Sequence, residues 1–319
     1  MSRGGSRADR SRAFADHTLA VDLGAHEHYR DAALYDFEYR RRRADVRWYV
    51  ELAARLLGGG GRILELGCGS GRVTVPLARA GHQVTALDHE PAMLAALEER
   101  RRRLPAAVAA RIEPVQGDLR TFALGRRFDL VLAAFNVVEH LYTRVEVDAC
   151  FRAVRRHLRP DGRFAFDVQL PDLPWLARDA SRRWARTRFT HPVTGEPLYY
   201  STNHDYDPVS QICVIRLYYT PVPPAASSET AAGVPRRARS LAPRARGLLA
   251  GSRRRREEVV VLSQRKFFPA ELEGLVAHAG LRVVERYGDF DGAPLGPGAD
   301  SQVLVCAAAR PKTAVSRRG

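Results

Sequence analysis

The chain has 319 residues, of which 45% are hydrophobic and 27% are charged, a composition that excludes a wholly disordered protein. Its formal net charge is +15. Three Arg-rich segments, at 1–12, 221–256 and 310–319, carry all of this excess, so the rest of the chain is neutral. A basic balance of this origin is a weak argument for binding nucleic acid, and we do not expect nucleic acid as a partner.

Apolar runs and cysteine spacing exclude several further classes. The longest apolar stretch, 130–138, is interrupted by Asn136 and is far shorter than the roughly 18 to 20 residues of a membrane helix. The first 14 residues hold no apolar segment of the kind found in secretory signals. The four cysteines lie 82, 63 and 93 residues apart, which fits neither a metal-binding pair nor a dense disulfide framework. We therefore expect a cytoplasmic protein with reduced thiols, no membrane contact and no metal.

In chain order, a polar Arg/Gly/Ser-rich stretch at 1–25 predicts a disordered tail. Apolar and aromatic positions at 26–57 then fit one or two helices, which we expect to form an N-terminal lid and which end at four glycines. Residues 62–170 alternate short apolar runs with helical patterns, which predicts a parallel sheet with helices on both faces. The expected strands are 62–66, 83–87, 111–115, 128–133 and 163–168, and the expected helices are 72–80, 91–103 and 144–158.

The pattern changes after residue 170. Segments rich in Tyr, Thr, Val and Ile, separated by turn residues, predict an antiparallel insertion at 182–265. A low-complexity Pro/Ala/Arg stretch at 221–256 interrupts it and is expected to be a flexible loop. Residues 266–309 return to the sheet and 310–319 form a basic tail, so 26–309 is expected to be one domain. The strands expected here are 186–191, 197–206, 210–220, 259–264, 281–287 and 302–307, with a helix at 269–279.

The strongest chemical signal is the run E-L-G-C-G-S-G-R at 65–72, at the junction of the first strand and a helix. Gly67, Gly69 and Gly71 allow tight turns that bring backbone N–H groups close to a ligand. A dinucleotide fingerprint would need another glycine where Arg72 stands, which disfavours a pyrophosphate ligand. Glu65 disfavours it as well, because a carboxylate repels phosphate but accommodates an aminoacyl group.

Acidic residues also end the next two strands. Asp88 ends the second, where a ribose with both hydroxyls free would be held. Asp118 follows the third and suits an exocyclic adenine amine, with Leu119 packing on the ring. Taken alone, such an Asp is more often a turn or cap residue. Because three strand ends in order carry the residue types that an adenosyl group needs, we predict an adenosyl site.

With these motifs the chain resembles the class I S-adenosylmethionine (SAM) dependent methyltransferases over about 26–309. Its Y-D-F-E-Y run at 35–39, F-F-P at 267–269 and Y-G-D-F-D at 287–291 are similar to bacterial small-molecule members. Among these are amino-sugar N,N-dimethyltransferases and glycine or sarcosine N-methyltransferase-like proteins. The resemblance implies a Rossmann-like α/β fold with a mostly parallel seven-stranded sheet, an N-terminal helical lid and an antiparallel insertion. It also implies SAM as cofactor and S-adenosylhomocysteine as product.

The resemblance assigns roles to individual residues. Glu65 would lie under the methionine part, Asp88 would bind the ribose, and Tyr39 would lie near the sulfonium. Arg42 would lie near the SAM carboxylate, although the Arg run at 40–43 fits a solvated helix face equally well. The cofactor-binding set implied in this way is Tyr39, Arg42, Glu65, Gly67, Cys68, Gly69, Gly71, Asp88, Met93, Asp118, Leu119 and Phe135.

On the acceptor side, His140 follows the fourth strand and is the best candidate base by its titration range. A histidine packing near the helix start at Thr143 is the competing interpretation. The predicted catalytic residues are His140 and Tyr39, and the predicted substrate-binding residues are His140, Tyr206 and Tyr287.

We expect a small-molecule acceptor. An amine is favoured slightly over a hydroxyl because an amine need only be bound as its free base, whereas a hydroxyl normally needs a general base. The class of relatives suggests secondary metabolism, and a monomer or homodimer is expected. Two alternatives stay open: an RNA or protein acceptor tethered by the Arg-rich 221–256 loop, and a non-catalytic SAM-binding partner protein.

Overall fold

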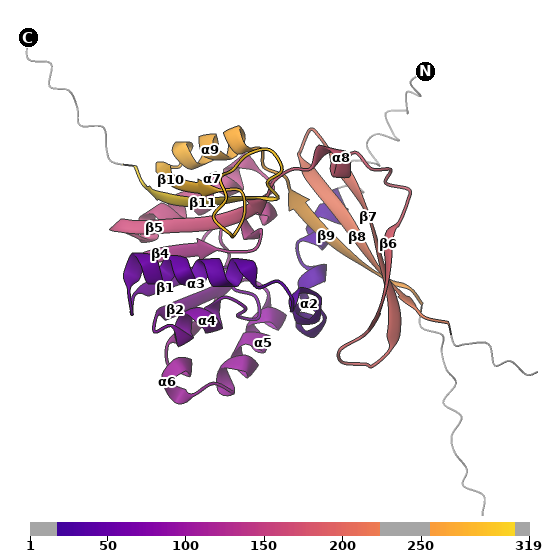
Figure 1. The fold of residues 1–319 in the computed structure, drawn as a ribbon, viewed down its shortest axis with the longest axis horizontal. Coiled ribbons are helices and arrows are strands. Elements are labelled where there is room, and N and C mark those ends of the chain that lie inside the picture. Colours follow the sequence, from indigo (N-terminus) through magenta and orange to yellow (C-terminus); the bar gives the residue numbers. More distant parts are fainter. Residues whose placement is uncertain (1–17, 224–255, 310–319) are drawn as a thin grey trace, which may run out of the picture.

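The computed structural model describes residues 18–223 and 256–309 (Figure 1). The predicted tail up to residue 17, residues 224–255 of the predicted loop, and the basic tail at 310–319 lie outside this part. A seven-stranded sheet in the order β10-β11-β5-β4-β1-β2-β3 forms the centre of the molecule. Its strands are β1 (Arg62–Leu66), β2 (Gln83–Asp88), β3 (Ile112–Gln116), β4 (Phe128–Ala133), β5 (Leu158–Gln169), β10 (Leu281–Tyr287) and β11 (Ser301–Ala308).

The strand directions confirm the predicted fold class. β1 pairs in parallel with β2 and β4, and the parallel pairing continues outward to β3 and β5. β11 runs antiparallel between β5 and β10. The sheet is therefore mostly parallel, as expected from strands that alternate with helices.

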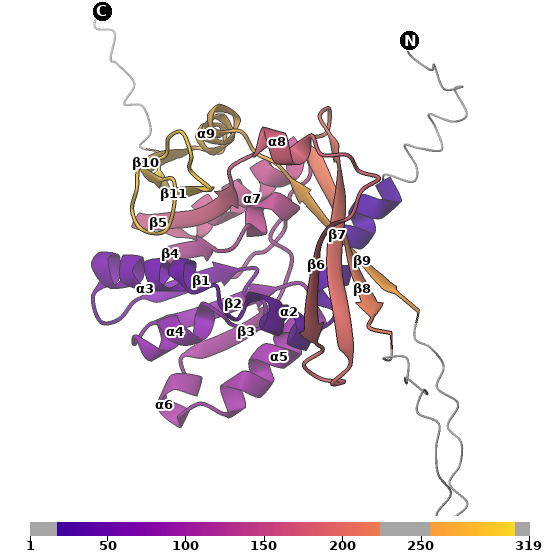
Figure 2. The ribbon, with the colours of Figure 1, turned by 45° about the vertical axis from the view of Figure 1, so that its right-hand side comes forward.

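Helices cover both faces of this sheet (Figures 1 and 2). Side chains alternate along β1, so that Leu64 and Leu66 join α7 and α9 in one core while Ile63 joins α3, α4 and α5 in the other. Residues 67–73, between β1 and α4, form the turns of a loop that we call the glycine loop. α4 therefore begins two residues later than predicted. The helices are α3 (Ala44–Leu57), α4 (Thr74–Arg79), α5 (Pro91–Arg102), α6 (Ala106–Ala109), α7 (Arg144–His157) and α9 (Pro269–His278).

The predicted antiparallel insertion is present as a second, four-stranded sheet in the order β6-β7-β8-β9. Figure 1 shows it beside the carboxyl ends of the parallel strands. β8 and β9 flank the undescribed segment 224–255 and pair directly with each other, up to Tyr219 opposite Glu258. The strands are β6 (Trp184–Thr190), β7 (Pro197–Asp207), β8 (Ile212–Pro221) and β9 (Glu258–Arg265), and the short helix α8 (Leu173–Leu176) precedes them.

The N-terminal segment, residues 18–43, differs from its prediction. Residues 18–24 are helical rather than a tail, because Val21 is buried against Ile212 and Val214 of the second sheet. The predicted lid at 26–57 divides in two. Its first part, η1 (Glu27–Tyr29) and α2 (Ala32–Tyr39), lies between the two sheets, whereas α3 packs on the parallel sheet (Figure 2).

The first part of the lid and the second sheet share an apolar core. Tyr29 and Leu34 pack with Leu217 and Leu262 of that sheet. The Tyr219 hydroxyl of β8 lies 2.7 Å from the Glu38 carboxylate of α2, to which it donates. The two segments therefore pack as one unit over the carboxyl edge of the parallel sheet. Within residues 18–223 and 256–309, no helix has the length and apolar character needed to cross a membrane.

Candidate functional site

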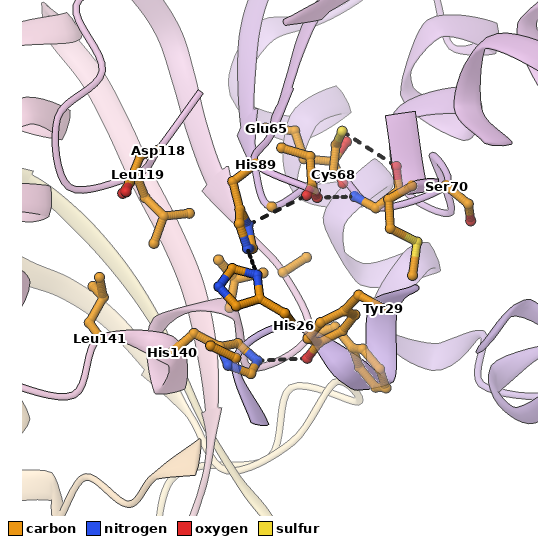
Figure 3. Close-up of a pocket in the computed structure, with 18 of the residues that line it drawn as sticks. His26, Tyr29, Glu65, Cys68, Ser70, His89, Asp118, Leu119, His140 and Leu141 are labelled. Atoms are coloured by element: carbon orange, nitrogen blue, oxygen red, sulfur yellow. Dashed lines mark hydrogen bonds and ion pairs between the residues drawn. The ribbon is translucent and has the colours of Figure 1, made fainter. Parts of the chain in front are cut away.

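A cavity of about 380 Å³ opens at the carboxyl ends of β1, β2 and β4 (Figure 3). The glycine loop, the end of β2, the segment after β3 and the loop after β4 supply most of its wall, and the N-terminal segment closes one side. The predicted cofactor residues that line it are Glu65, Gly67, Cys68, Gly69, Asp88, Met93, Asp118, Leu119 and Phe135. The sequence motifs thus converge on one cavity.

The glycine loop holds a shape that other residues would strain. Gly67 has a φ of 63°, and a Cβ there would lie 2.5 Å from Cγ2 of Val137. Gly71 has a φ of 87°, and a Cβ there would collide with Leu97 of α5. Both glycines are therefore required by left-handed backbone and by close packing. Gly71 supports the loop from behind and does not line the cavity.

Asp88 joins this loop to the end of β2. One carboxylate oxygen accepts from the Gly69 N–H at 2.7 Å, and the other accepts from the Glu90 N–H at 2.9 Å. Burial raises the pKa of Asp88, although these backbone bonds oppose the shift. Each oxygen of a carboxylate has two acceptor positions, so one on each remains for a ligand hydroxyl.

The two other predicted carboxylates lie in contrasting surroundings. Glu65 is buried under the loop, and desolvation raises its pKa to about 8 in spite of a hydrogen bond from Thr74. Asp118 is partly exposed at the rim, and hydrogen bonds from Arg120 hold its pKa below the usual value. Glu65 is therefore poised to respond to a cation in the cavity, while Asp118 already has a cationic partner.

The loop after β4 is held by a residue that the sequence analysis missed. Phe135 and Asn136 both have left-handed φ, at 66° and 63°. Their N–H groups donate to the Asp167 carboxylate at 2.7 and 3.1 Å, and the Tyr49 hydroxyl donates to it at 2.6 Å. Burial raises the pKa of Asp167 to about 6. An isolated acid near the carboxyl end of an otherwise apolar strand was the available signal.

Aromatic rings form the wall below the N-terminal segment. Tyr29 and Tyr35 line the cavity, with ring centroids 5.7 Å apart. Tyr39 lies behind them, 4.7 Å from Tyr35 and 4.9 Å from Phe135, and therefore does not line the cavity. Its hydroxyl is 3.1 Å from His28 Nε2. Tyr35 is thus the nearer of the two to the cavity, and the predicted role of Tyr39 beside the sulfonium stays a prediction.

Arg72, rather than Arg42, is the arginine in the cavity wall. Its guanidinium lies 4.5 Å from the Phe135 ring centroid and pairs with the buried Asp45 at 2.6 Å. Arg42 lies farther out, 5.7 Å from the same ring centroid. Arg72, directly after the glycine loop, and Asp45, in the first turn of α3, thus form an ion pair at the cavity wall. The resemblance had assigned the positive charge near the ligand to Arg42 instead.

His140 faces the cavity, but its surroundings make it a weak base. Its Nε2 lies 2.7 Å from the Tyr29 hydroxyl, and its Nδ1 lies 3.3 Å from the Tyr142 hydroxyl (Figure 3). Burial lowers the pKa of His140 to about 3, so the ring is neutral at pH 7. This geometry favours the competing interpretation, a packed and hydrogen-bonded histidine.

Comparison with known proteins matches the part of the chain that supplies the glycine loop and most of the cavity wall. The family model described as a methyltransferase domain matches residues 63–162, which supply the glycine loop and the ends of β2, β3 and β4. Residues 63–162 thus match a methyltransferase domain, and the solved structures described next share the fold. The match leaves the N-terminal segment and the second sheet outside the family model.

The chain is similar in sequence to curated methyltransferases and in fold to solved ones. A dTDP-3-amino-3,6-dideoxy-alpha-D-glucopyranose N,N-dimethyltransferase from Streptomyces fradiae is 34% identical over 138 residues, which are 41% of this chain and 50% of its own. The CcbJ methyltransferase from Streptomyces caelestis superposes with a TM-score of 0.66 at 23% identity, over 90% of this chain and 99% of its own. The glycopeptide N-methyltransferase MtfA, solved with SAM, has a TM-score of 0.52 at 21% identity, over 83% and 87%. The chain spans about half the length of the curated relatives it matches.

Two predicted substrate residues lie outside this cavity. Tyr206 is on β7 opposite Cys213, and Tyr287 ends β10 at the outer edge of the large sheet. The Tyr287 hydroxyl donates to Glu285, and its ring centroid is 5.9 Å from that of Trp48. Tyr206 was predicted from its position on a strand of the insertion and Tyr287 from its position at the end of a strand, and neither pattern reveals where that strand lies in a sheet.

Proposed function

We propose that the protein transfers methyl groups from SAM to an amine of a small molecule. The observation that carries this proposal is the cavity at the ends of β1 and β2, where the glycine loop, Asp88 and an aromatic wall meet. Its volume is within the range of small-ligand sites. When bound, SAM supplies a methyl group whose carbon is already electrophilic because it is bonded to a sulfonium sulfur.

The residues present fit that cofactor. The acceptor positions left on Asp88 suit the two ribose hydroxyls, and Met93 and Leu119 offer apolar surface for an adenine. Glu65 provides a carboxyl group beneath the loop for the ammonium of the methionine part. Apolar, acidic and glycine components thus all occur in the wall of one cavity.

The aromatic wall does the remaining work of positioning. The electron-rich faces of Tyr29, Tyr35 and Phe135 stabilise a cationic centre and exclude water from it. Burial raises the pKa of both tyrosines, so their hydroxyls stay neutral. Alignment of an acceptor with the methyl group in such a site contributes on the order of 7–11 kcal/mol.

An amine acceptor suits this site better than a hydroxyl. His140, the candidate base, has both ring nitrogens hydrogen-bonded and a pKa lowered to about 3 by burial. A base of that strength does not deprotonate a hydroxyl effectively, whereas an amine bound as its free base needs no deprotonation before attack. Named relatives that methylate nitrogen, an amino-sugar N,N-dimethyltransferase and a cypemycin N-terminal methyltransferase from a Streptomyces species, support the same assignment.

The proposal is tested first by cofactor binding and then by turnover. Isothermal titration should show one SAM site per chain. Incubation with SAM and a panel of amino-sugar nucleotides, short peptides with free N-termini, phenols and RNA should yield S-adenosylhomocysteine only with the amines. Mass spectrometry should show products heavier by one or two methyl groups. Products from phenols or RNA alone would overturn the amine assignment, and SAM binding without any product would favour a non-catalytic role.

A variant of Asp88 tests the cofactor assignment. We expect Asp88→Ala to weaken SAM binding by about 10- to 100-fold, because it removes charge-assisted hydrogen bonds worth ~1.5–3 kcal/mol. Asp148→Asn is the matched control, since Asp148 pairs with Arg152 on the surface of α7. Titration of both variants should separate them. Equal SAM affinity in Asp88→Ala and wild type would show that the ribose is held elsewhere.

A further inference from the structure

Two histidines and a glutamate meet at the mouth of the cavity. His26 comes from the N-terminal segment, His89 directly follows β2, and Glu90 directly precedes α5. Figure 3 shows His26 and His89 side by side, with a hydrogen bond joining their rings. These three residues come from parts of the chain that only the folded structure brings together, and the proposed methyl transfer does not use them as a group.

Their donor atoms are spaced as ligands of one small cation. His89 Nε2 lies 3.2 Å from His26 Nδ1, and His26 Nδ1 lies 3.6 Å from Glu90 Oε2. All three atoms lie within 4.8 Å of one another. Tetrahedral ligands about 2.0–2.2 Å from a Zn²⁺ ion are separated by roughly 3.3–3.6 Å, so small side-chain movements suffice to bind one.

The surroundings of His89 favour the tautomer that a metal needs. Its second nitrogen, Nδ1, lies 3.8 Å from Oδ1 of Asp88, which is buried. A proton on Nδ1 would face this carboxylate, leaving the Nε2 lone pair directed at His26 and the site. Zinc-ligating histidines commonly have a carboxylate on the side of the second ring nitrogen, and Asp88 lies on that side of His89, beyond hydrogen-bond distance.

We propose that His26, His89 and Glu90 form a Zn²⁺ site that fastens the N-terminal segment to the core at the cavity mouth. Two imidazoles and one carboxylate suit Zn²⁺ and related borderline cations better than Mg²⁺ or Ca²⁺, which take mostly oxygen ligands. Three protein ligands leave the fourth position to water. Cysteine spacing predicts no metal, but it carries no information about histidines that are distant in sequence and meet only in the folded chain.

The test uses the full-length protein without a histidine tag and ZnCl₂ as the titrant. Isothermal titration should give one Zn²⁺ per wild-type chain, with affinity at least 10-fold weaker in His26→Ala, His89→Ala and Glu90→Gln. His278→Ala is the matched control, because His278 is an exposed histidine near a surface carboxylate, Asp148. Wild-type affinity in the three variants, or no binding to the wild type, would overturn the proposal and leave a simple hydrogen bond between the two rings.

A second measurement shows whether the metal fastens the segment. Hydrogen exchange at residues 18–30 should slow on adding Zn²⁺ to the wild type and stay unchanged in His89→Ala. Far-ultraviolet circular dichroism of each variant confirms that it is folded. Zinc binding without any slowing of exchange in this segment would overturn the fastening role.

Discussion

The buried Glu65 carboxyl should make the stability of the ligand-free protein depend on pH. Burial raises its pKa from 4.5 to about 8, so between these values the folded state keeps a proton that the unfolded state has lost. Its stabilising contribution is thus complete below pH 4.5 and is lost as the pH rises through 8. We expect the fall in melting temperature from pH 6 to pH 9 to be smaller in Glu65→Gln by a few degrees, since 1 kcal/mol corresponds to about 2–4 °C in a protein of this size.

Thermal melts of wild type and variant across this range measure the effect. Glu99→Gln is the matched control because Glu99 is exposed on α5 and pairs with Arg103. Its pH dependence should follow that of the wild type. A Glu65→Gln variant with an unchanged pH slope would show that the carboxyl is not protonated in the folded protein.

At the residue scale, local motifs could be read from the sequence and distant partners could not. Gly67 and Asp88 were predictable because their roles follow from a turn and a strand end within a short run. Asp167 could not be assigned, because its partners Phe135 and Tyr49 lie 32 and 118 residues away. The pairing of Arg72 could not be predicted either, because its partner Asp45 lies in α3, 27 residues earlier in the chain.

At the element scale, one buried ion pair joins three segments that do not follow one another in the chain. Lys266, after β9, donates to Glu139 at 2.7 Å and to Gln169, at the end of β5, at 2.9 Å. Glu139 belongs to η2 (Val137–His140), the short 3-10 helix that also carries His140. The side chains of Lys266 and Glu139 are 2% and 0% exposed, so water screens this pair very little.

Breaking this pair on one side should cost more than removing both charges. We expect Lys266→Met to lower the free energy of unfolding by about 3–5 kcal/mol, because Glu139 is left as a buried, unpaired charge. The double variant Lys266→Met/Glu139→Gln should recover part of that loss. Urea unfolding monitored by circular dichroism measures both. Equal losses in the single and double variants would contradict a buried charge penalty.

An exposed pair provides the control for that experiment. Arg286 and Glu273 pair at 2.6 Å with side chains 58% and 38% exposed. Arg286→Met should change the free energy of unfolding by no more than about 1 kcal/mol. A loss as large as that of Lys266→Met would mean that the assay does not distinguish buried from exposed pairs.

Elements were predicted well where their own periodicity decides their structure. The core strands and α7 are of this kind, and the Thr143 capping box marks the start of α7. The helix at 18–24 has no such signal, because Val21 is a single apolar anchor whose partners are on β8. The division of the predicted lid between two sheets likewise depends on contacts that the local pattern does not contain.

At the scale of the whole molecule, the excess charge is separable from the catalytic body. Residues 224–255 contain eight Arg and one Glu, a net +7. They connect β8 and β9, which are already paired neighbours. We expect replacement of 224–255 by a short Gly-Asn turn to leave the melting temperature and SAM affinity within error of the wild type. Thermal melts and titration measure both.

The same deletion tests the RNA alternative. Binding that falls steeply with salt in the wild type and is lost in the deletion would assign the segment to an anionic partner. Loss of SAM affinity would instead show that the segment contributes to the cofactor cavity. An unchanged protein in both assays would show that the basic segment is dispensable for binding of either kind.

We expect the packing of the N-terminal segment against the second sheet to constrain how an acceptor preference can be moved from one protein to another. Tyr29 lines the cavity and packs, together with Leu34, against Leu217 and Leu262, so one wall of the cavity rests on residues nearly 200 positions away in the chain. Exchange of only one of these two segments between proteins would leave the shared core mismatched. Transfer of a new acceptor preference should therefore require exchange of 18–43 and 182–265 together, with the 63–162 core left in place.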